Sequence, residues 1–145
     1  MKFLTLLLFL FLTSCALKAI PANYDINSFE KAIIPDDLGN GKVLIYSGAD
    51  WKHQIDNTAR LNVLIDNIAL GQVRPKEYVI IKLELGVHKI SLKHIDLVNM
   101  RSEHELIIEE NTKIIEIKPT ITSNKTTITN ELPDDFNEFK YVIKR

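Results

Sequence analysis

The chain has 145 residues, of which 18 are basic and 19 are acidic, so its formal net charge at pH 7 is −1. This length fits one domain with a hydrophobic core. The balanced charge argues against nucleic-acid binding, which depends on a clustered excess of basic side chains. A single cysteine excludes disulfides within the chain and metal sites built from several thiolates.

The N-terminal residues have the features of a bacterial export signal. Lys2 supplies a positive charge, and an apolar run extends from Phe3 to Leu12. The run falls in the range of about 7 to 15 residues for the hydrophobic part of a signal peptide, and it is shorter than the roughly 20 residues that cross a bilayer as a helix. Small residues follow it, as the cleft of a signal peptidase requires. Cys15, however, stands where an ordinary secretory signal has another small residue.

The sequence Leu12-Thr13-Ser14-Cys15 resembles the lipobox of bacterial lipoproteins, which consists of a Leu, two small residues and a Cys. The resemblance implies that the Cys15 thiol receives a diacylglycerol group, that a dedicated peptidase removes the signal peptide, residues 1–14, and that the new amino group is acylated. Since each buried methylene contributes about 0.8 kcal/mol, two or three acyl chains form a stable membrane anchor. The alternative is an ordinary or uncleaved signal in which this cysteine is incidental.

Ala16 bears on the membrane in which such an anchor would lie. In Gram-negative lipoproteins, an Asp directly after the lipidated Cys marks retention in the inner membrane. Because Ala16 is not acidic, the resemblance favours the outer membrane, with the protein facing the periplasm. The expected partners are therefore the membrane, through the lipid anchor, and an envelope protein.

Residues 15–41 are interpreted as the lipidated cysteine and a flexible tether, because Pro, Asn, Asp and Gly dilute the apolar residues in this part of the chain. One turn of helix over Asn27–Ile34 is the only regular structure expected there. Asp36 and Asp37 predict a solvated turn rather than a metal site, since no third ligand follows at a coordinating spacing.

Residues 42–131 predict an all-β domain. Lys42–Ser47 is apolar on both faces, which is typical of a strand inside a sheet. Leu61–Ile65 and Ile68–Gly71 flank the dipeptide Asp66-Asn67, whose residues tolerate positive φ. This stretch therefore predicts a hairpin with a two-residue turn.

Two more strands follow the hairpin. Residues 77–85 alternate, and their apolar face carries Val79, Ile81, Leu83 and Leu85. Residues 88–94 also alternate, and one face carries His88, Ile90, Leu92 and His94. The two histidines lie about 20 Å apart at the rise of a strand, too far to bind one metal ion together. We expect each to be a hydrogen-bonded residue near a strand end, while a pairing in space with His53 or His104 stays open.

Three segments together resemble a family of small bacterial lipoproteins of uncharacterised function: the strand Val43–Tyr46, the hairpin Val63–Gly71 and the stretch Gly86–Ile90. The hairpin and the last stretch are also similar to PEGA-type domains, in which a Pro-Gly-x-His-like turn precedes a strand. With the lipobox, the resemblance extends from Cys15 to about Pro119. It implies a PEGA-like or transthyretin-like β-sandwich on a lipid tether and supplies no catalytic residues.

The last part of the chain predicts further strands. Residues 105–109 and 112–118 predict a second hairpin, and residues 120–129 predict a Thr-rich, mostly exposed ribbon with its turn at Ser123-Asn124. The C-terminal segment, residues 132–145, fits either a short helix or a strand, and we favour the helix. Short strands separated by frequent turn signals favour an all-β fold, a small antiparallel β-sandwich.

The sequence contains no motif that points to catalysis. It lacks a nucleophile elbow, a phosphate-binding glycine loop, a zinc-binding helix motif and paired catalytic carboxylates. We therefore expect neither an enzymatic activity nor a cofactor or metal site.

Two functions fit an anchored β-sandwich. In the first, the domain is an interaction module, and an envelope protein adds a strand to an exposed edge such as the Thr-rich ribbon. In the second, it binds a small ligand or glycan, with Trp51, Tyr46 and Tyr78 as candidate stacking surfaces. Trp51 stands in the loop Gly48–Arg60, where it either covers the edge of the core or contacts a ligand. A structural role as a spacer is a third alternative.

Overall fold

Nine strands make up the β structure of the described residues. The computed structural model describes residues 17–24, 35–49, 58–95 and 98–142, and every structural statement below concerns these residues. In chain order the strands are β1 (Lys42–Ser47), β2 (Leu61–Ile65), β3 (Ile68–Val73), β4 (Glu77–Lys82), β5 (Gly86–Ile95), β6 (Asn99–Ile108), β7 (Ile114–Pro119), β8 (Asn124–Ile128) and β9 (Lys140–Tyr141). Short 3₁₀ turns lie at Pro35–Asp37 and Phe136–Glu138.

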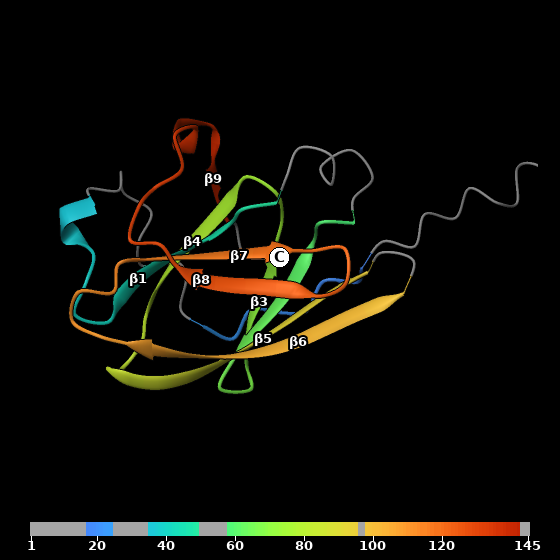
Figure 1. The fold of residues 1–145 in the computed structure, drawn as a ribbon, viewed down its shortest axis with the longest axis horizontal. Coiled ribbons are helices and arrows are strands. Elements are labelled where there is room, and N and C mark those ends of the chain that lie inside the picture. The colour runs from blue at the N-terminus through green and yellow to red at the C-terminus, as the bar shows by residue number, and fades with distance from the viewer. Residues whose placement is uncertain (1–16, 25–34, 50–57, 96–97, 143–145) are drawn as a thin grey trace, which may run out of the picture.

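The strands form two sheets that stack as a β-sandwich (Figure 1). One sheet has the order β8-β7-β1-β4-β9, and the other has the order β3-β2-β5-β6. The all-β sandwich expected from the sequence is confirmed. The first sheet, however, is mixed rather than antiparallel, because β1 runs parallel to β7 and β4 runs parallel to β9. The second sheet is antiparallel throughout.

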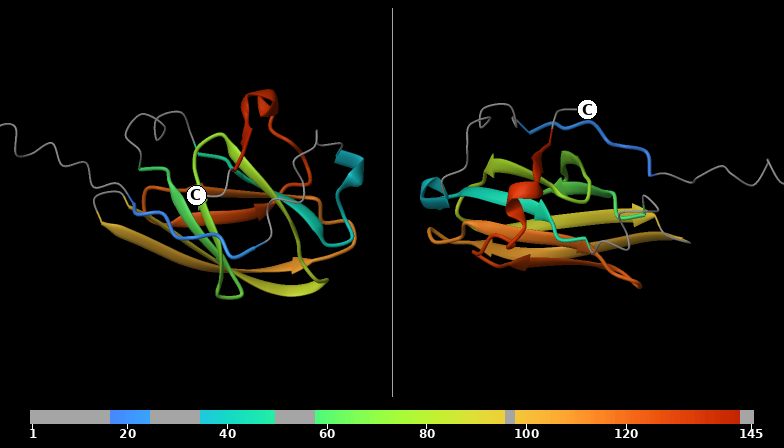
Figure 2. Two further views of the ribbon diagram at one scale, coloured as in Figure 1. Left: turned by 180° about the vertical axis from the view of Figure 1, so that it is seen from behind. Right: turned by 90° about the horizontal axis from the view of Figure 1, so that it is seen from above.

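Strand β1 lies in the centre of its sheet, between β4 and β7, as its two apolar faces predict. Val43 and Ile45 belong to the core between the sheets, whereas Leu44 and Tyr46 belong to a second cluster on the other face. All four side chains are buried. The C-terminal segment covers the outer face of this sheet (Figure 2), which explains why both faces of β1 are apolar.

The main core fills the space between the two sheets. Its members alternate with outward-facing residues along each strand. The alternation predicted from the sequence is therefore confirmed for β4, where it extends to Leu83, and for β5, where it extends to His94. The largest fully buried side chains of this core are Ile45, Leu61, Ile65, Leu70, Ile81, Ile90, Leu92, Ile108 and Ile115.

The hairpin of β2 and β3 is confirmed. Asp66 and Asn67 have φ values of 50° and 67°, the left-handed conformation that both central residues of such a turn require. Ile65 pairs with Ile68 on either side of them. The Lys89 N–H of β5 donates a hydrogen bond of 2.9 Å to Asp66 Oδ1, which ties the turn to the next strand of the sheet.

The second hairpin predicted for residues 105–118 is wrong. Strand β6 pairs with β5 along its whole length, whereas β7 lies in the other sheet between β1 and β8. A turn does follow β6, since the Thr112 N–H donates to the Glu109 carbonyl, but the chain crosses there from one sheet to the other. Alternation identified both strands without specifying their partners.

Three smaller expectations also need correction. Leu85 lies beyond the end of β4 and is 51% exposed, so it does not belong to the core face. The turn of the Thr-rich ribbon lies at residues 120–123, where the Thr120 N–H donates to the Ser123 carbonyl, and Asn124 is already a buried residue of β8. The C-terminal segment contains both a 3₁₀ turn and the short strand β9 rather than a helix alone.

Candidate functional site

Residues 17–24 lie along β2 and β3 (Figure 2). Leu17 is buried, and the Asn23 N–H donates a hydrogen bond of 2.8 Å to the Ala69 carbonyl of β3. The sequence predicted a flexible tether over residues 15–41. For residues 17–24 that prediction is corrected, because hydrogen bonds and buried apolar contacts hold this part of the chain on the domain.

Two buried amide side chains bind the backbone of this segment. Asn62 and Gln72 lie opposite each other on β2 and β3 and face away from the core between the sheets. Asn62 Nδ2 donates to the Lys18 carbonyl at 2.8 Å, and Gln72 Nε2 lies 3.1 Å from both the Leu17 carbonyl and Asn62 Oδ1. Since a buried amide without partners is costly, these bonds favour the docked segment over a free one.

Gly71 permits the close approach of the segment. It has a φ of +110°, which residues with a Cβ rarely adopt. A Cβ built at this position would lie 3.2 Å from the Cβ of Ala22, closer than ordinary van der Waals contact. The absence of a side chain at Gly71 therefore serves both the backbone conformation of β3 and the packing of the segment.

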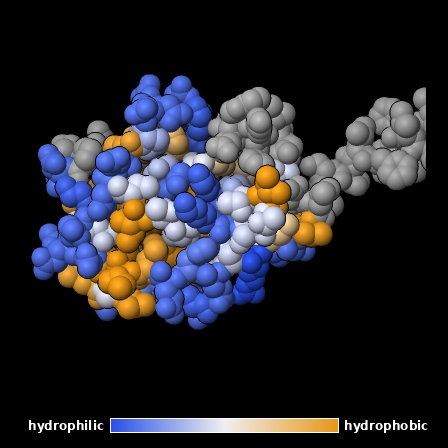
Figure 3. Space-filling model, in the orientation of Figure 1, coloured by the Kyte–Doolittle hydropathy of each residue, from blue (hydrophilic) through white to orange (hydrophobic). Residues whose placement is uncertain are grey.

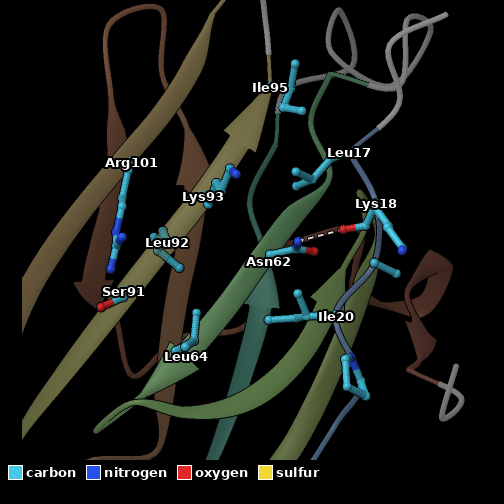
Figure 4. A pocket seen from close by; sticks show the side chains of 12 residues that line it. Leu17, Lys18, Ile20, Asn62, Leu64, Ser91, Leu92, Lys93, Ile95 and Arg101 are labelled. Carbon is cyan, nitrogen blue, oxygen red and sulfur yellow. Dashed lines mark hydrogen bonds between the residues drawn. The ribbon is translucent and has the colours of Figure 1, made fainter.

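A pocket of about 690 Å³ lies between the segment and the side chains of β2, β5 and β6 (Figure 4). Its lining combines apolar side chains with three cations. The apolar group includes Leu17, Ile20, Leu64 and Ile95, and the cations are Lys18, Lys93 and Arg101. None of the described residues that line it is acidic.

The cations of the pocket are only partly neutralised. Lys93 and Arg101 pair across β5 and β6, and Arg101 Nη2 lies 3.6 Å from Glu103 Oε1. The other Glu103 oxygen binds Lys89 Nζ at 2.6 Å, and this hydrogen bond is the main cause that lowers the pKa of Glu103. Lys18 and Lys93 have no ion-pair partner in the described part of the chain. The rim of the pocket is therefore positive.

The lipobox residues Leu12, Thr13, Ser14 and Cys15 lie outside the described residues. Trp51 and His53 also lie outside them, as does the helical turn expected at Asn27–Ile34. The lipid anchor and the role of Trp51 stay predictions. Within the described ranges, no helix has the length and the apolar character that a membrane crossing requires.

The structure places Tyr46 and Tyr78 beneath the C-terminal segment, where Tyr46 is buried and Tyr78 is partly buried. The ring centroid of Tyr46 lies 5.7 Å from that of Phe139, and the ring centroid of Tyr78 lies 5.0 Å from that of Phe136. Tyr46 is 5% exposed. Burial raises the pKa of both phenols above the ordinary value. Aromatic rings of the chain's own C-terminal segment therefore pack against both phenol rings.

The described histidines are hydrogen-bonded to neighbouring side chains. The pairs are His88 with Asp66 at 2.6 Å, His94 with Asn124 at 2.6 Å and His104 with Ser102 at 3.0 Å. Among the residues that the structure describes, no three His, Cys, Asp or Glu side chains are grouped so that they could hold a metal ion. Each of these histidines therefore links its strand to a neighbouring side chain through a hydrogen bond.

Sequence reasoning missed the docked segment and its pocket. The sequence does contain a signal that another segment packs on the outer face of the predicted hairpin. Asn62 and Gln72 face each other there, and an apolar residue, Leu64, follows on the same face. Leu17 and Ile20 offered matching apolar residues within the predicted tether. Their pairing depends on contacts between distant parts of the chain, which periodicity does not report.

Comparison of the chain with family models, with curated proteins and with solved structures finds no match. The resemblance to small lipoproteins with PEGA-like domains thus stays a prediction from the residues quoted above.

Proposed function

We propose that this chain is a lipid-anchored protein of the bacterial envelope, with a non-catalytic β-sandwich that acts as an interaction domain close to the membrane. The observation that carries the proposal is the position of Leu17, which is buried against the domain two residues after Cys15 of the lipobox. Two residues of extended chain span about 7 Å. An acylated Cys15 would therefore bring this side of the sandwich next to the lipid surface.

An envelope protein is the proposed partner, and strand β8 is its proposed contact. Strand β8 lies at one edge of the five-stranded sheet and pairs with β7. An edge strand can receive a further strand through its outer backbone groups. Lys125 is its one charged residue, whereas β6 at the edge of the other sheet carries Arg101, Glu103 and Glu105, and such charges oppose strand addition.

Binding of a small ligand is the second candidate function. The sequence analysis suggested aromatic stacking for this function, but Phe139 and Phe136 of the C-terminal segment already pack against Tyr46 and Tyr78. The observation that favours it now is the pocket beside residues 17–24, with its apolar wall and positive rim. The two functions use different surfaces, so a substitution on β8 should weaken partner binding without changing the binding of a ligand in the pocket.

Metabolic labelling with an alkyne fatty acid tests the anchor. We expect label on the wild-type chain and an intact mass that shows the loss of residues 1–14. The Cys15→Ser variant should show neither, whereas Thr13→Ala keeps a small residue in the lipobox and should be labelled normally. An unlabelled wild-type chain would refute the anchor.

Crosslinking in intact cells, followed by capture and mass spectrometry, tests the interaction. We expect one abundant envelope protein on the wild-type chain and its loss from Thr127→Lys, because a lysine on an edge strand opposes strand addition. Thr127 pairs with Glu116, so the new lysine gains a favourable neighbour. Because the Thr127 hydroxyl is buried, circular dichroism of the variant checks that the fold is retained. Glu105→Lys on β6 is the matched control. Equal capture by both variants would refute the assignment to β8.

A further inference from the structure

The pocket beside residues 17–24 has the volume and the apolar lining of a site for a hydrocarbon chain. Its volume of about 690 Å³ falls within the range of about 300 to 1,000 Å³ for pockets that bury small ligands. Leu17 and Ile20 extend from the N-terminal segment toward the strands, and Leu64 lies opposite them on β2 (Figure 4). Apolar side chains that line such a space favour an apolar ligand, because its transfer out of water is favourable.

The charged residues of the pocket add a requirement for an anionic group. Lys93 and Arg101 lie side by side on β5 and β6, whereas Lys18 lies on the N-terminal segment with its side chain directed away from them (Figure 4). Arg101 has Glu103 at 3.6 Å, whereas Lys18 and Lys93 have no ion-pair partner in the described part of the chain. Guanidinium and ammonium groups are the side chains that recognise phosphate oxygens.

We propose that this pocket binds an anionic phospholipid, with one acyl chain along Leu17 and Ile20 and the phosphate at Lys93 and Arg101. The membrane that the anchor would hold against this surface supplies the lipid, and this part of the inference rests on the proposed function. The binding chemistry does not rest on it, since every residue that carries it belongs to the folded domain.

A second apolar surface shows why the lipid is assigned to the pocket. Leu85, Val87 and Ile107 are exposed at the other end of β5 and β6, and hydrophobic surface appears there at the lower left of Figure 3. Glu109 and Glu110 line the shallow hollow beside Leu85. Carboxylates repel an anionic head group, so this surface lacks the charge complementarity that the pocket has.

Native mass spectrometry of the purified full chain in detergent tests the proposal. The probes are palmitoyl-lysophosphatidylglycerol, which is anionic, and palmitoyl-lysophosphatidylcholine, which has no net charge. We expect one anionic lipid per chain, bound at least tenfold more tightly than the zwitterionic one. The double variant Lys93→Gln and Arg101→Gln should reduce this preference at least fivefold.

The control variant is Lys82→Gln, which removes an exposed cation from β4 of the other sheet and should leave the preference unchanged. A second variant, Leu64→Trp, fills the pocket and should reduce the affinity for both lipids. Its circular dichroism spectrum and melting temperature report whether the fold is retained. Equal binding of both lipids, or a preference unaffected by the double variant, would overturn the proposal.

The Cys15→Ser variant separates this inference from the proposed anchor. If labelling shows no acyl group on Cys15 while the anionic lipid still binds, the anchor fails and the pocket stands. If the lipid binds Cys15→Ser but not the acylated wild-type chain, the acyl group of Cys15 itself fills the pocket. That result would overturn the membrane as the source of the bound lipid.

Discussion

His94 Nδ1 donates a hydrogen bond of 2.6 Å to Asn124 Oδ1 and joins the two sheets of the sandwich. His94 belongs to β5, and Asn124 is the first residue of β8. Both side chains are buried, and Asn124 Nδ2 also donates to the Leu92 carbonyl at 3.3 Å. Because these polar groups satisfy one another inside the protein, the pair fixes the beginning of β8 against the opposite sheet.

Asn124→Ala should therefore lower the free energy of unfolding by about 1–3 kcal/mol, because the buried imidazole and the Leu92 carbonyl lose their partner. Urea denaturation measures the change. Lys125→Ala, at the next and exposed position, should stay within about 0.5 kcal/mol of the wild-type chain. Equal losses in the two variants would show that the hydrogen bond does not join the sheets as described.

The sequence predicted the strands that carry a local signature. The apolar faces of Lys42–Ser47 indicated a central strand, and Asp66-Asn67 indicated the turn of a hairpin, because the required φ values are a local property of these residues. The pairing of β7 was not predicted. Its neighbour β1 lies far away in the sequence and runs parallel to it, so no turn between them specifies the contact.

The candidate site was harder to predict than the fold. Residues 17–24 have the composition of a linker, and their order comes from Asn62, Gln72 and Gly71 on distant strands. The C-terminal aromatic residues raise the same difficulty. Tyr46 has the character of a binding residue in the sequence, but in the fold its ring packs against Phe139 of the C-terminal segment. In both cases the sequence pattern identifies an apolar surface but does not identify the distant part of the chain that packs on it.

Gly71→Ala should destabilise the domain and release the N-terminal segment. The φ of +110° and the contact with Ala22 both disfavour a Cβ, and strained backbone of this kind costs about 1–3 kcal/mol. Hydrogen exchange measures the local effect, since the Asn23 N–H is bonded to the Ala69 carbonyl. We expect its exchange to accelerate at least tenfold.

Gly86→Ala is the matched control for this prediction. Gly86 has a φ of +132°, but a Cβ there would meet no atom within 4 Å. Its substitution should lower the free energy of unfolding through backbone strain alone. The exchange of the Asn23 N–H should then accelerate only by the factor that the global loss of stability accounts for. If both variants accelerate that exchange equally relative to their stability, Gly71 has no specific role in holding the segment.

Asp66→Asn should make the stability of the domain less dependent on pH. Asp66 accepts hydrogen bonds from the Lys89 N–H and from His88, and the bond from Lys89 is the main cause that lowers the pKa of Asp66 below 3.8. A lowered pKa in the folded state stabilises the protein above pH 3.8, and this contribution disappears as the pH falls through the folded pKa. The side chain is 42% exposed, so solvent screening limits the effect to about 1 kcal/mol.

Urea denaturation at pH 7 and near pH 3 measures this difference. We expect Asp66→Asn to be less stable than the wild-type chain at pH 7 and to approach it at the lower pH. Asn tolerates the φ of 50°, so the substitution removes the charge without straining the turn. Asp37→Asn, at an exposed residue of a 3₁₀ turn, serves as the control. A constant gap between wild type and Asp66→Asn at both pH values contradicts the prediction.

Phe139→Ala should lower the pKa of Tyr46. The Phe139 ring packs edge-on against Tyr46 at 5.7 Å, and burial is the main cause that raises the pKa of this phenol. Removing the ring admits water, which stabilises the phenolate. Because Phe139 is only half-buried, the loss of stability should stay below the roughly 3–5 kcal/mol for a fully buried Phe. Titration of ¹³C-labelled tyrosine by NMR resolves the separate phenols.

Phe136→Ala is the matched control, because the Phe136 ring lies 5.0 Å from that of Tyr78. This variant should lower the pKa of Tyr78 instead, since burial also raises the pKa of that phenol. If both variants shift the pKa of the same phenol, the C-terminal segment leaves the sheet as one unit.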